Sequence, residues 1–154
     1  MSSLHQDLIN YFERGAPEDG SGKALIESLP YLKFLGIQTS PQQDGTVLTT
    51  LPFKDELVGN AQLPAIHGGV IGSFLEVTAI VQLIWIGQAQ FMPRTVNMTV
   101  DYMRSGRAAP LYGRAIVSKL GRRLSNVRVE CWQSDPEKLT AVAIGNFLTT
   151  QDKG

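Results

Sequence analysis

The chain has 154 residues and a mass of 16.9 kDa, which is enough for one domain with a substantial hydrophobic core. Fourteen basic and fourteen acidic residues give a formal net charge of zero, so the charge balance indicates no nucleic-acid or membrane-surface partner. Hydrophobic residues make up 43% and charged residues 18%, as in ordinary soluble domains. A net charge near zero also leaves little repulsion to oppose the formation of oligomers.

The N-terminal segment and the cysteine content bear on the compartment. Residues 1–15 lack the basic and apolar regions of a secretory signal peptide. The single cysteine, Cys131, excludes an intrachain disulfide and falls in a strand-like segment, where a small buried hydrophobe is a simpler interpretation than a nucleophile. We therefore expect a cytoplasmic protein.

Residues 1–33 are predicted to form a short helical extension. An amphipathic pattern over 3–14 predicts one helix, and a second short helix is predicted over 23–34 with an interruption at Pro30. The main domain is expected to cover residues 34–150.

Two strands are predicted next, over 36–40 and 46–51. The turn between them contains Asp44 and Gly45, a pair that is typical of β-hairpins. Residues 54–66 show no clear period and are predicted to be irregular.

The pattern over residues 67–88 is helical and apolar almost all round, as expected of a helix that other elements surround. Its apolar stretch is long enough to span a membrane, but five small or polar residues interrupt it: Gly72, Ser73, Glu76, Thr78 and Gln82. We therefore predict a buried helix of a soluble domain and no membrane partner.

Four further strands are predicted as a meander, over 95–102, 111–120, 124–132 and 139–150. In the first of them, strict alternation puts Thr95 on the face opposite Met98 and Tyr102. Strands without intervening helices favour an antiparallel sheet, so the predicted class is α+β, with one apolar helix on the concave face of the sheet. Such a sheet has exposed edge strands, and pairing across a two-fold axis would cover them.

The start of the central helix is the candidate functional site. The first N–H groups of a helix have no internal partner and lie at the positive end of its dipole, and Gly68 and Gly69 leave them open to a ligand. Glu76 is the single formal charge between Glu56 and Arg94. A carboxylate in an apolar setting needs a partner, a route to solvent or a shifted pKa, so a structural and a catalytic role both stay open.

The histidine before the glycines has a similar ambiguity. His67 either forms a local hydrogen bond at the helix start or takes part in chemistry. A metal site is disfavoured because the other histidine, His5, is far away in the sequence.

The motif His67-Gly68-Gly69, with an acid nine positions after the histidine at Glu76, resembles the hotdog-fold acyl-CoA thioesterases. The most similar types are those of the phenylacetate pathway and the 4-hydroxybenzoyl-CoA thioesterases. The resemblance covers roughly residues 34–150 and implies a hotdog fold, an antiparallel sheet wrapped around one long central helix. It also implies a homodimer or a dimer of dimers with shared active sites, acting on acyl-CoA without a metal or cofactor.

The resemblance assigns five residues to catalysis. The Gly68 N–H would polarise the thioester carbonyl, and Glu76 of the facing subunit would act as nucleophile or as general base. His67 would lie beside the thioester, and Asn60 would orient the attacking water or the carboxylate. Thr95 would position a water, although an ordinary β-branched strand residue is the alternative.

Gly69, Arg122 and Arg123 are the candidate residues for binding CoA. Guanidinium groups suit the phosphates, and the alternative is a solvated hairpin turn. Arg104 and Arg128 are weaker candidates for the same role. Four apolar residues are candidates for an acyl pocket or, more simply, for the core: Trp85, Phe91, Met92 and Met103.

Three functions therefore remain in view. The first is an acyl-CoA thioester hydrolase. The second is a hotdog enoyl-CoA hydratase or dehydratase, and the third is an acyl-CoA-binding module without catalysis.

Overall fold

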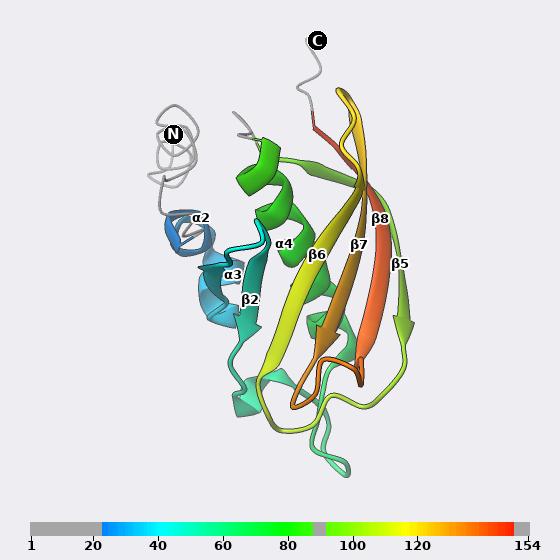
Figure 1. Cartoon of the computed structure of the whole chain (residues 1–154). Coiled ribbons are helices and arrows are strands. Elements are labelled where there is room, and N and C mark those ends of the chain that lie inside the picture. Colours follow the sequence, from blue (N-terminus) through cyan, green and yellow to red (C-terminus); the bar gives the residue numbers. More distant parts are fainter. Residues whose placement is uncertain (1–22, 88–91, 150–154) are drawn as a thin grey trace.

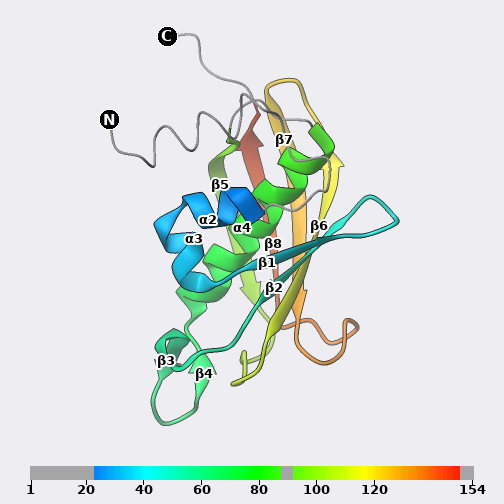
Figure 2. The same ribbon diagram turned by 90° about the vertical axis from the view of Figure 1, so that its left-hand side faces the viewer.

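A computed structural model describes residues 23–87 and 92–149, so the helix predicted over 3–14 lies outside the described residues. Six antiparallel strands form one curved sheet around a long helix, α4 (Gly68–Gly87). Two short helices, α2 (Lys23–Ser28) and α3 (Pro30–Leu35), lie on the side of α4 away from most of the sheet (Figures 1 and 2). This is the predicted α+β arrangement with a single central helix.

The two short helices confirm the predicted break at Pro30. This proline stands in the first turn of α3, where its missing N–H costs nothing. Gly36 ends α3 in the left-handed region, with φ 70°, and its N–H donates to the carbonyls of Leu32 and Lys33. Leu32 and Leu35 are buried in the same core as α4, so this part of the extension packs onto the domain. The boundary at residue 33 stays a prediction.

The predicted hairpin is confirmed as β1 (Gln38–Pro41) and β2 (Val47–Leu51). Gly45 has a φ of 84°, a conformation that side chains rarely adopt. The Asp44 carboxylate accepts hydrogen bonds from the Thr46 hydroxyl at 2.6 Å and the Thr46 N–H at 3.0 Å. These bonds lower the pKa of Asp44 below its ordinary value, with the hydroxyl as the larger cause.

The polar residues of α4 have different environments. Gln82 is buried and bonds the hairpin, accepting from the Val47 N–H at 2.8 Å and donating to the Gly45 carbonyl at 3.1 Å. Thr78 is also buried, and its hydroxyl forms a hydrogen bond of 2.7 Å with the hydroxyl of Thr49. By length and composition α4 could cross a membrane, but 61% of its most apolar 18-residue stretch is buried inside the fold. Of these polar side chains, Glu76 is the ionisable one, and it is only half-buried.

The predicted meander is wrong in one respect. The order of the sheet is β1-β2-β6-β7-β8-β5, so the first strand after the helix joins β8 at the far edge. The strands are β5 (Arg94–Tyr102), β6 (Leu111–Lys119), β7 (Leu124–Trp132) and β8 (Ala141–Leu148). The chain after β5 crosses the end of β8, where the N–H groups of Met103 and Arg104 donate to the Thr140 carbonyl. Among the described strands, β5 is therefore an edge.

The predicted alternation in β5 is wrong at its first residues. Thr95 pairs with Phe147 and Asn97 with Asn146, so β5 has one extra residue there relative to β8. This bulge puts Thr95 on the same face as Met98 and Tyr102, the face that lies against α4.

The segment 54–66 was predicted to be irregular and instead contains short regular elements. They are η1 (Asp55–Leu57), β3 (Val58–Asn60) and β4 (Ala65–Ile66), with β3 and β4 paired antiparallel. The His67 N–H donates to the Leu57 carbonyl at 2.8 Å, which fixes the chain just before α4. The segment is therefore a support for the start of α4.

Candidate active site

The first turn of α4 carries an open backbone donor. His67 precedes the helix, and its carbonyl accepts from the N–H groups of Val70 and Ile71. Its imidazole Nδ1 accepts from the Gly69 N–H at 2.9 Å. The Gly68 N–H has no hydrogen-bond partner within residues 23–87 and 92–149. It lies at the positive end of the helix dipole, where a carbonyl oxygen that gains negative charge would be stabilised.

Two glycines leave the space that the His67 side chain occupies. A Cβ on Gly59 of β3 would lie 2.7–2.8 Å from the Cα, Cβ and Cδ2 of His67, which no side chain can do without displacing it. A Cβ on Gly69 would lie 3.0 Å from Nδ1. Because Nδ1 accepts a hydrogen bond, a neutral His67 carries its proton on Nε2, as a donor.

Glu76 lies two turns further along α4. Its Oε1 accepts from the Thr95 hydroxyl on β5 at 2.5 Å. It forms no ion pair with any of the residues that the structure describes. The carboxylate is therefore oriented by a hydroxyl, and its second oxygen has no hydrogen bond within the described chain.

Tyr102, at the other end of β5, contacts the start of α4. Its hydroxyl donates to the Gly68 carbonyl at 2.7 Å. Tyr102, Gly68 and Ile71 also line an open hollow of about 370 Å³, together with Met103 and Arg104. One strand thus binds both parts of the site, the helix start through Tyr102 and the carboxylate through Thr95.

These two parts are too far apart to act together within one chain. Eight residues of α-helix separate Gly68 from Glu76, which corresponds to about 12 Å along the axis. Along β5, Thr95 and Tyr102 are roughly 20 Å apart. A thioester carbonyl bonded to the Gly68 N–H therefore lies beyond the reach of the Glu76 carboxylate of the same chain.

Comparison with known proteins identifies the family. The sequence profile of the thioesterase superfamily matches residues 63–140, half of the chain, which include the start of α4, Glu76 and Thr95. The chain belongs to the thioesterase superfamily. This confirms the family that the His-Gly-Gly motif and the acid predicted.

Curated relatives and solved structures agree with this membership. The chain is 25% identical over 129 residues to the medium/long-chain acyl-CoA thioesterase YigI of Salmonella typhimurium, covering 74% of this chain and 82% of that one. It is 27% identical over 126 residues to YigI of Escherichia coli K12, covering 71% and 79%.

Two solved structures illustrate the fold. A protein of Chromobacterium violaceum is 32% identical, with a TM-score of 0.69, covering 96% of this chain and 99% of that one. The PaaI protein of the E. coli phenylacetic acid degradation operon is 20% identical, with a TM-score of 0.73, covering 94% and 96%. At that identity the likeness to PaaI shows the fold alone, and the match confirms the predicted hotdog fold.

Two further predicted site residues, Asn60 and Gly69, form local hydrogen bonds near the start of α4. Asn60 ends β3, and its Oδ1 accepts from the N–H groups of Gln62 and Leu63 at 3.0 and 3.3 Å. It thereby closes the turn between β3 and β4. Gly69 is exposed, but its N–H is already bonded to His67. Because Gly69 has no side chain, it leaves space for a ligand at the helix start.

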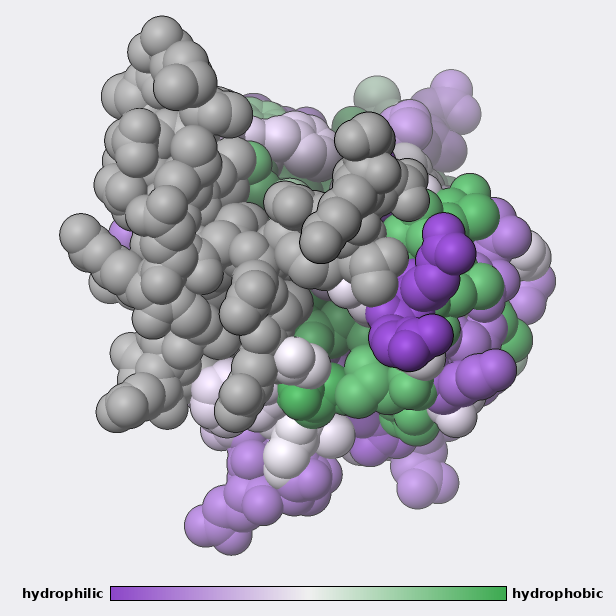
Figure 3. Space-filling model, turned by 90° about the horizontal axis from the view of Figure 1, so that it is seen from above, coloured by the Kyte–Doolittle hydropathy of each residue, from purple (hydrophilic) through white to green (hydrophobic). Residues whose placement is uncertain are grey.

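The structure does not bring Arg122 and Arg123 to the helix start of their own chain. They lie in the turn between β6 and β7, at the end of the sheet where Leu124 pairs with Leu148, and Leu148 with Arg94. This is the end of β5 that carries Thr95. Hydrophilic and hydrophobic surfaces stand side by side there (Figure 3), and both arginines are exposed.

The weaker arginine candidates lie elsewhere. Arg104 donates to the Leu139 carbonyl at 2.8 Å and borders the hollow next to Gly68. Arg128 lies on the outer face of the sheet and forms an ion pair with Glu130 at 3.1 Å. Arg128 therefore points away from the helix side of the sheet.

The candidate acyl-pocket residues divide between core and surface. Trp85 and Met92 are partly buried and pack against the core, as the simpler interpretation predicted. Met103 is 57% exposed and borders the hollow beside Gly68. Phe91 lies outside the described residues.

Cys131 is a free and buried cysteine of β7. Burial raises the pKa of the Cys131 thiol to about 12, so the thiol stays protonated at neutral pH and is a poor nucleophile. In the described ranges, no group of three His, Cys, Asp or Glu side chains could hold a metal ion.

Two tyrosines near the site were not predicted from the sequence. Tyr102 was assigned to a strand, yet its place at the end of the helix-facing row was a usable signal for a polar partner. Tyr31 of α3 donates to the Ser73 hydroxyl at 3.2 Å, and Ser73 donates to the Gly69 carbonyl at 2.9 Å. No pattern in the sequence links Tyr31 to α4, because the contact depends on how α3 packs.

Proposed function

We propose that the protein is an acyl-CoA thioester hydrolase, which converts acyl-CoA and water into a carboxylic acid and free CoA. The observation that carries the proposal is that one helix, α4, presents both an unbonded Gly68 N–H at its start and, two turns later, a Glu76 carboxylate that has no cationic partner in the described chain. These are the two groups that thioester hydrolysis needs, one to stabilise the oxyanion and one to attack or to activate water.

We further propose that each active site is shared between two chains. The edge strand β5 has nine residues and unpaired backbone groups along its outer side, so a second copy pairing antiparallel to it would complete the sheet. Antiparallel pairing about the middle of β5 puts Thr95 of one chain opposite Tyr102 of the other. The carboxylate of one subunit then approaches the Gly68 N–H of its partner, which overcomes the separation within one chain.

In this site Thr95 and His67 have distinct roles. The Thr95 hydroxyl holds Oε1 of Glu76, so Oε2 is left for the acyl carbon or for a water. Both the nucleophilic and the general-base route are compatible with this geometry. His67 lies beside the thioester, with Nε2–H as a second donor. Asn60 supports the loop that precedes it.

The CoA part of the substrate is proposed to reach Arg122 and Arg123 of the subunit that supplies Glu76, because those arginines lie at the Thr95 end of the sheet. The YigI relatives act on medium- and long-chain acyl-CoA, so these esters are the first substrates to test. The proposed location is the cytoplasm, because a single cysteine, Cys131, fits a reducing compartment.

The proposal is tested by measuring thiol release from a panel of acyl-CoA esters, from short to long alkyl chains and with aryl groups. We expect release of free CoA from at least one class. Formation or hydration of an enoyl-CoA with the thioester intact would establish the hydratase instead. Binding of acyl-CoA with no turnover across the panel would establish the binding module.

The shared site is tested by mixing two inactive variants. Gly68→Pro removes the N–H at a helix position where proline is tolerated, and Glu76→Gln removes the carboxylate. Each alone is expected to be inactive. After joint refolding, half of the dimers contain one chain of each kind. Each mixed dimer has one intact site, whereas a wild-type dimer has two. About a quarter of the wild-type activity should therefore return. No recovery in verified mixed dimers would place both groups in one chain.

A further inference from the structure

Tyr102 contacts the start of α4 with both its hydroxyl and its ring. The hydroxyl donates to the Gly68 carbonyl at 2.7 Å. A Cβ on Gly68 would lie 3.5 Å from the ring atoms Cε1 and Cζ, and one on Gly72 would lie 3.5 Å from the hydroxyl. The tyrosine therefore lies against Gly68 in the first turn of α4 and against Gly72 at the beginning of the second turn.

The first turn of α4 needs a restraint from outside the helix. Gly68 and Gly69 give a substrate access to the helix start, but glycine has more backbone freedom than any other residue and is less favourable in a helix than alanine. The first turn also lacks the internal hydrogen bonds of the later turns. A backbone donor in such a turn moves unless other groups fix the peptide planes around it.

One peptide group in this turn is held at both ends. Its carbonyl, from Gly68, accepts from Tyr102, and its N–H, from Gly69, donates to Nδ1 of His67. Hydrogen bonds at the two ends of a peptide group polarise it in the same direction and strengthen each other. The Tyr102 hydroxyl thus acts on the glycine pair and, through it, on the orientation and tautomer of His67.

We propose that Tyr102 is a positioning residue, which fixes the Gly68–Gly69 peptide and so holds the Gly68 N–H and His67 in the geometry that stabilises the oxyanion. This inference rests on the proposed thioesterase function. A donor that is already in place costs no reorganisation when charge develops on the carbonyl oxygen, so the contribution of Tyr102 is to the rate of the chemical step. Tyr102 does not need to contact the substrate for this role.

The test is Tyr102→Phe, which keeps the ring and removes the hydroxyl. We expect kcat to fall about 5- to 10-fold with KM close to wild type, the effect of losing one neutral hydrogen bond. Backbone amide exchange at residues 68–71 is expected to become faster, and this readout needs no substrate. The matched control is Tyr112→Phe, because Tyr112 lies on β6 with its ring 6.5 Å from that of Trp132, away from the site.

Two results would overturn the inference. One is wild-type kcat together with unchanged amide exchange at 68–71 in Tyr102→Phe. The other is a raised KM with kcat unchanged, which would make Tyr102 a substrate-binding residue. If the wild-type protein cleaves no thioester, the proposed function fails, and amide exchange alone still decides whether the hydroxyl fixes the turn.

Discussion

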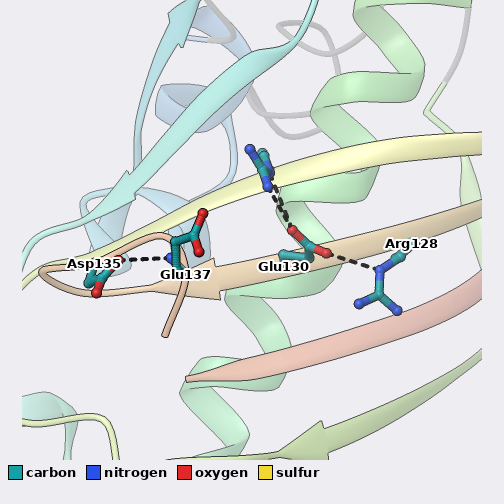
Figure 4. Close-up of polar contacts among 5 residues, drawn as sticks. Arg128, Glu130, Asp135 and Glu137 are labelled. Atoms are coloured by element: carbon teal, nitrogen blue, oxygen red, sulfur yellow. Dashed lines mark hydrogen bonds and ion pairs between the residues drawn. The ribbon is translucent and has the colours of Figure 1, made fainter. Parts of the chain in front are cut away.

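Two glutamates on opposite sides of the sheet show how the same side chain is used in two ways. Glu130 on β7 lies on the outer face between two arginines, at 3.0 Å from Arg114 and 3.1 Å from Arg128 (Figure 4). Glu76 on α4 lies on the inner side, where its partner is the Thr95 hydroxyl. Both are at least half-buried, so the difference is in their partners.

The partners determine what each carboxylate can do. Burial alone would raise the pKa of Glu130, but hydrogen bonds and charge from Arg114 and Arg128 more than offset it, and the pKa lies below its ordinary value. A carboxylate matched by two guanidinium groups has its lone pairs engaged. Glu76 keeps an oxygen available, so the comparison predicts that one glutamate is catalytic and the other structural.

The largest expected effect comes from exchanging each acid for its amide. Glu76→Gln should lower kcat by about 10³-fold, because an amide neither attacks a thioester nor accepts a proton from water at neutral pH. Glu130→Gln should keep turnover within about twofold, since Glu130 lies on the opposite face of the sheet from α4. Thiol-release assays of both variants measure this, with circular dichroism to check the fold. Equal activities would remove the proposed role of Glu76.

A smaller effect on kcat is expected when the hydroxyl of Thr95, the hydrogen-bond partner of Glu76, is removed. Thr95→Val keeps the shape of the side chain and removes the hydrogen bond that orients Oε1, so kcat should fall about 10-fold. The matched control is Thr99→Val, on the same strand with an exposed side chain that faces away from α4. If both variants retain wild-type kcat, the contact between Thr95 and Glu76 has no catalytic role.

Thr95 also shows which parts of the site the sequence predicted. The motif from His67 to Gly69 and the acid at Glu76 predicted the helix start and the carboxylate, because helix geometry depends on local sequence. The resemblance to thioesterases includes Thr95 as a candidate, but simple alternation predicts the wrong face of the strand for it. The bulge that turns it toward α4 depends on pairing with β8, which is distant in the sequence.

In the fold, too, features set by neighbouring residues were predictable and features set by distant contacts were not. The hairpin turn at Asp44 and Gly45 and the break at Pro30 were predicted from local residues and are confirmed. The order of the strands was not predicted, because the connection after β5 is held by contacts between Met103, Arg104 and the distant Thr140. The strand pattern indicated that Tyr102 needs a polar partner, but the identity of that partner, the Gly68 carbonyl, is visible only when β5 lies beside the first turn of α4.

The smallest expected effect is on stability and comes from the outer face. Glu130→Gln should lower the free energy of unfolding at pH 7 by about 1 kcal/mol, a modest value because the two arginines are 46% and 40% exposed and solvent screens the pairs. The pKa of Glu130 is lower in the folded chain than its ordinary value of 4.5, so its contribution is present above pH 4.5 and is lost as the pH falls through the folded pKa. Urea unfolding of both proteins between pH 7 and pH 3 should therefore show two curves that converge at the acidic end. A difference that stayed constant or grew toward pH 3 would mean that the charge of Glu130 is not what stabilises the outer face.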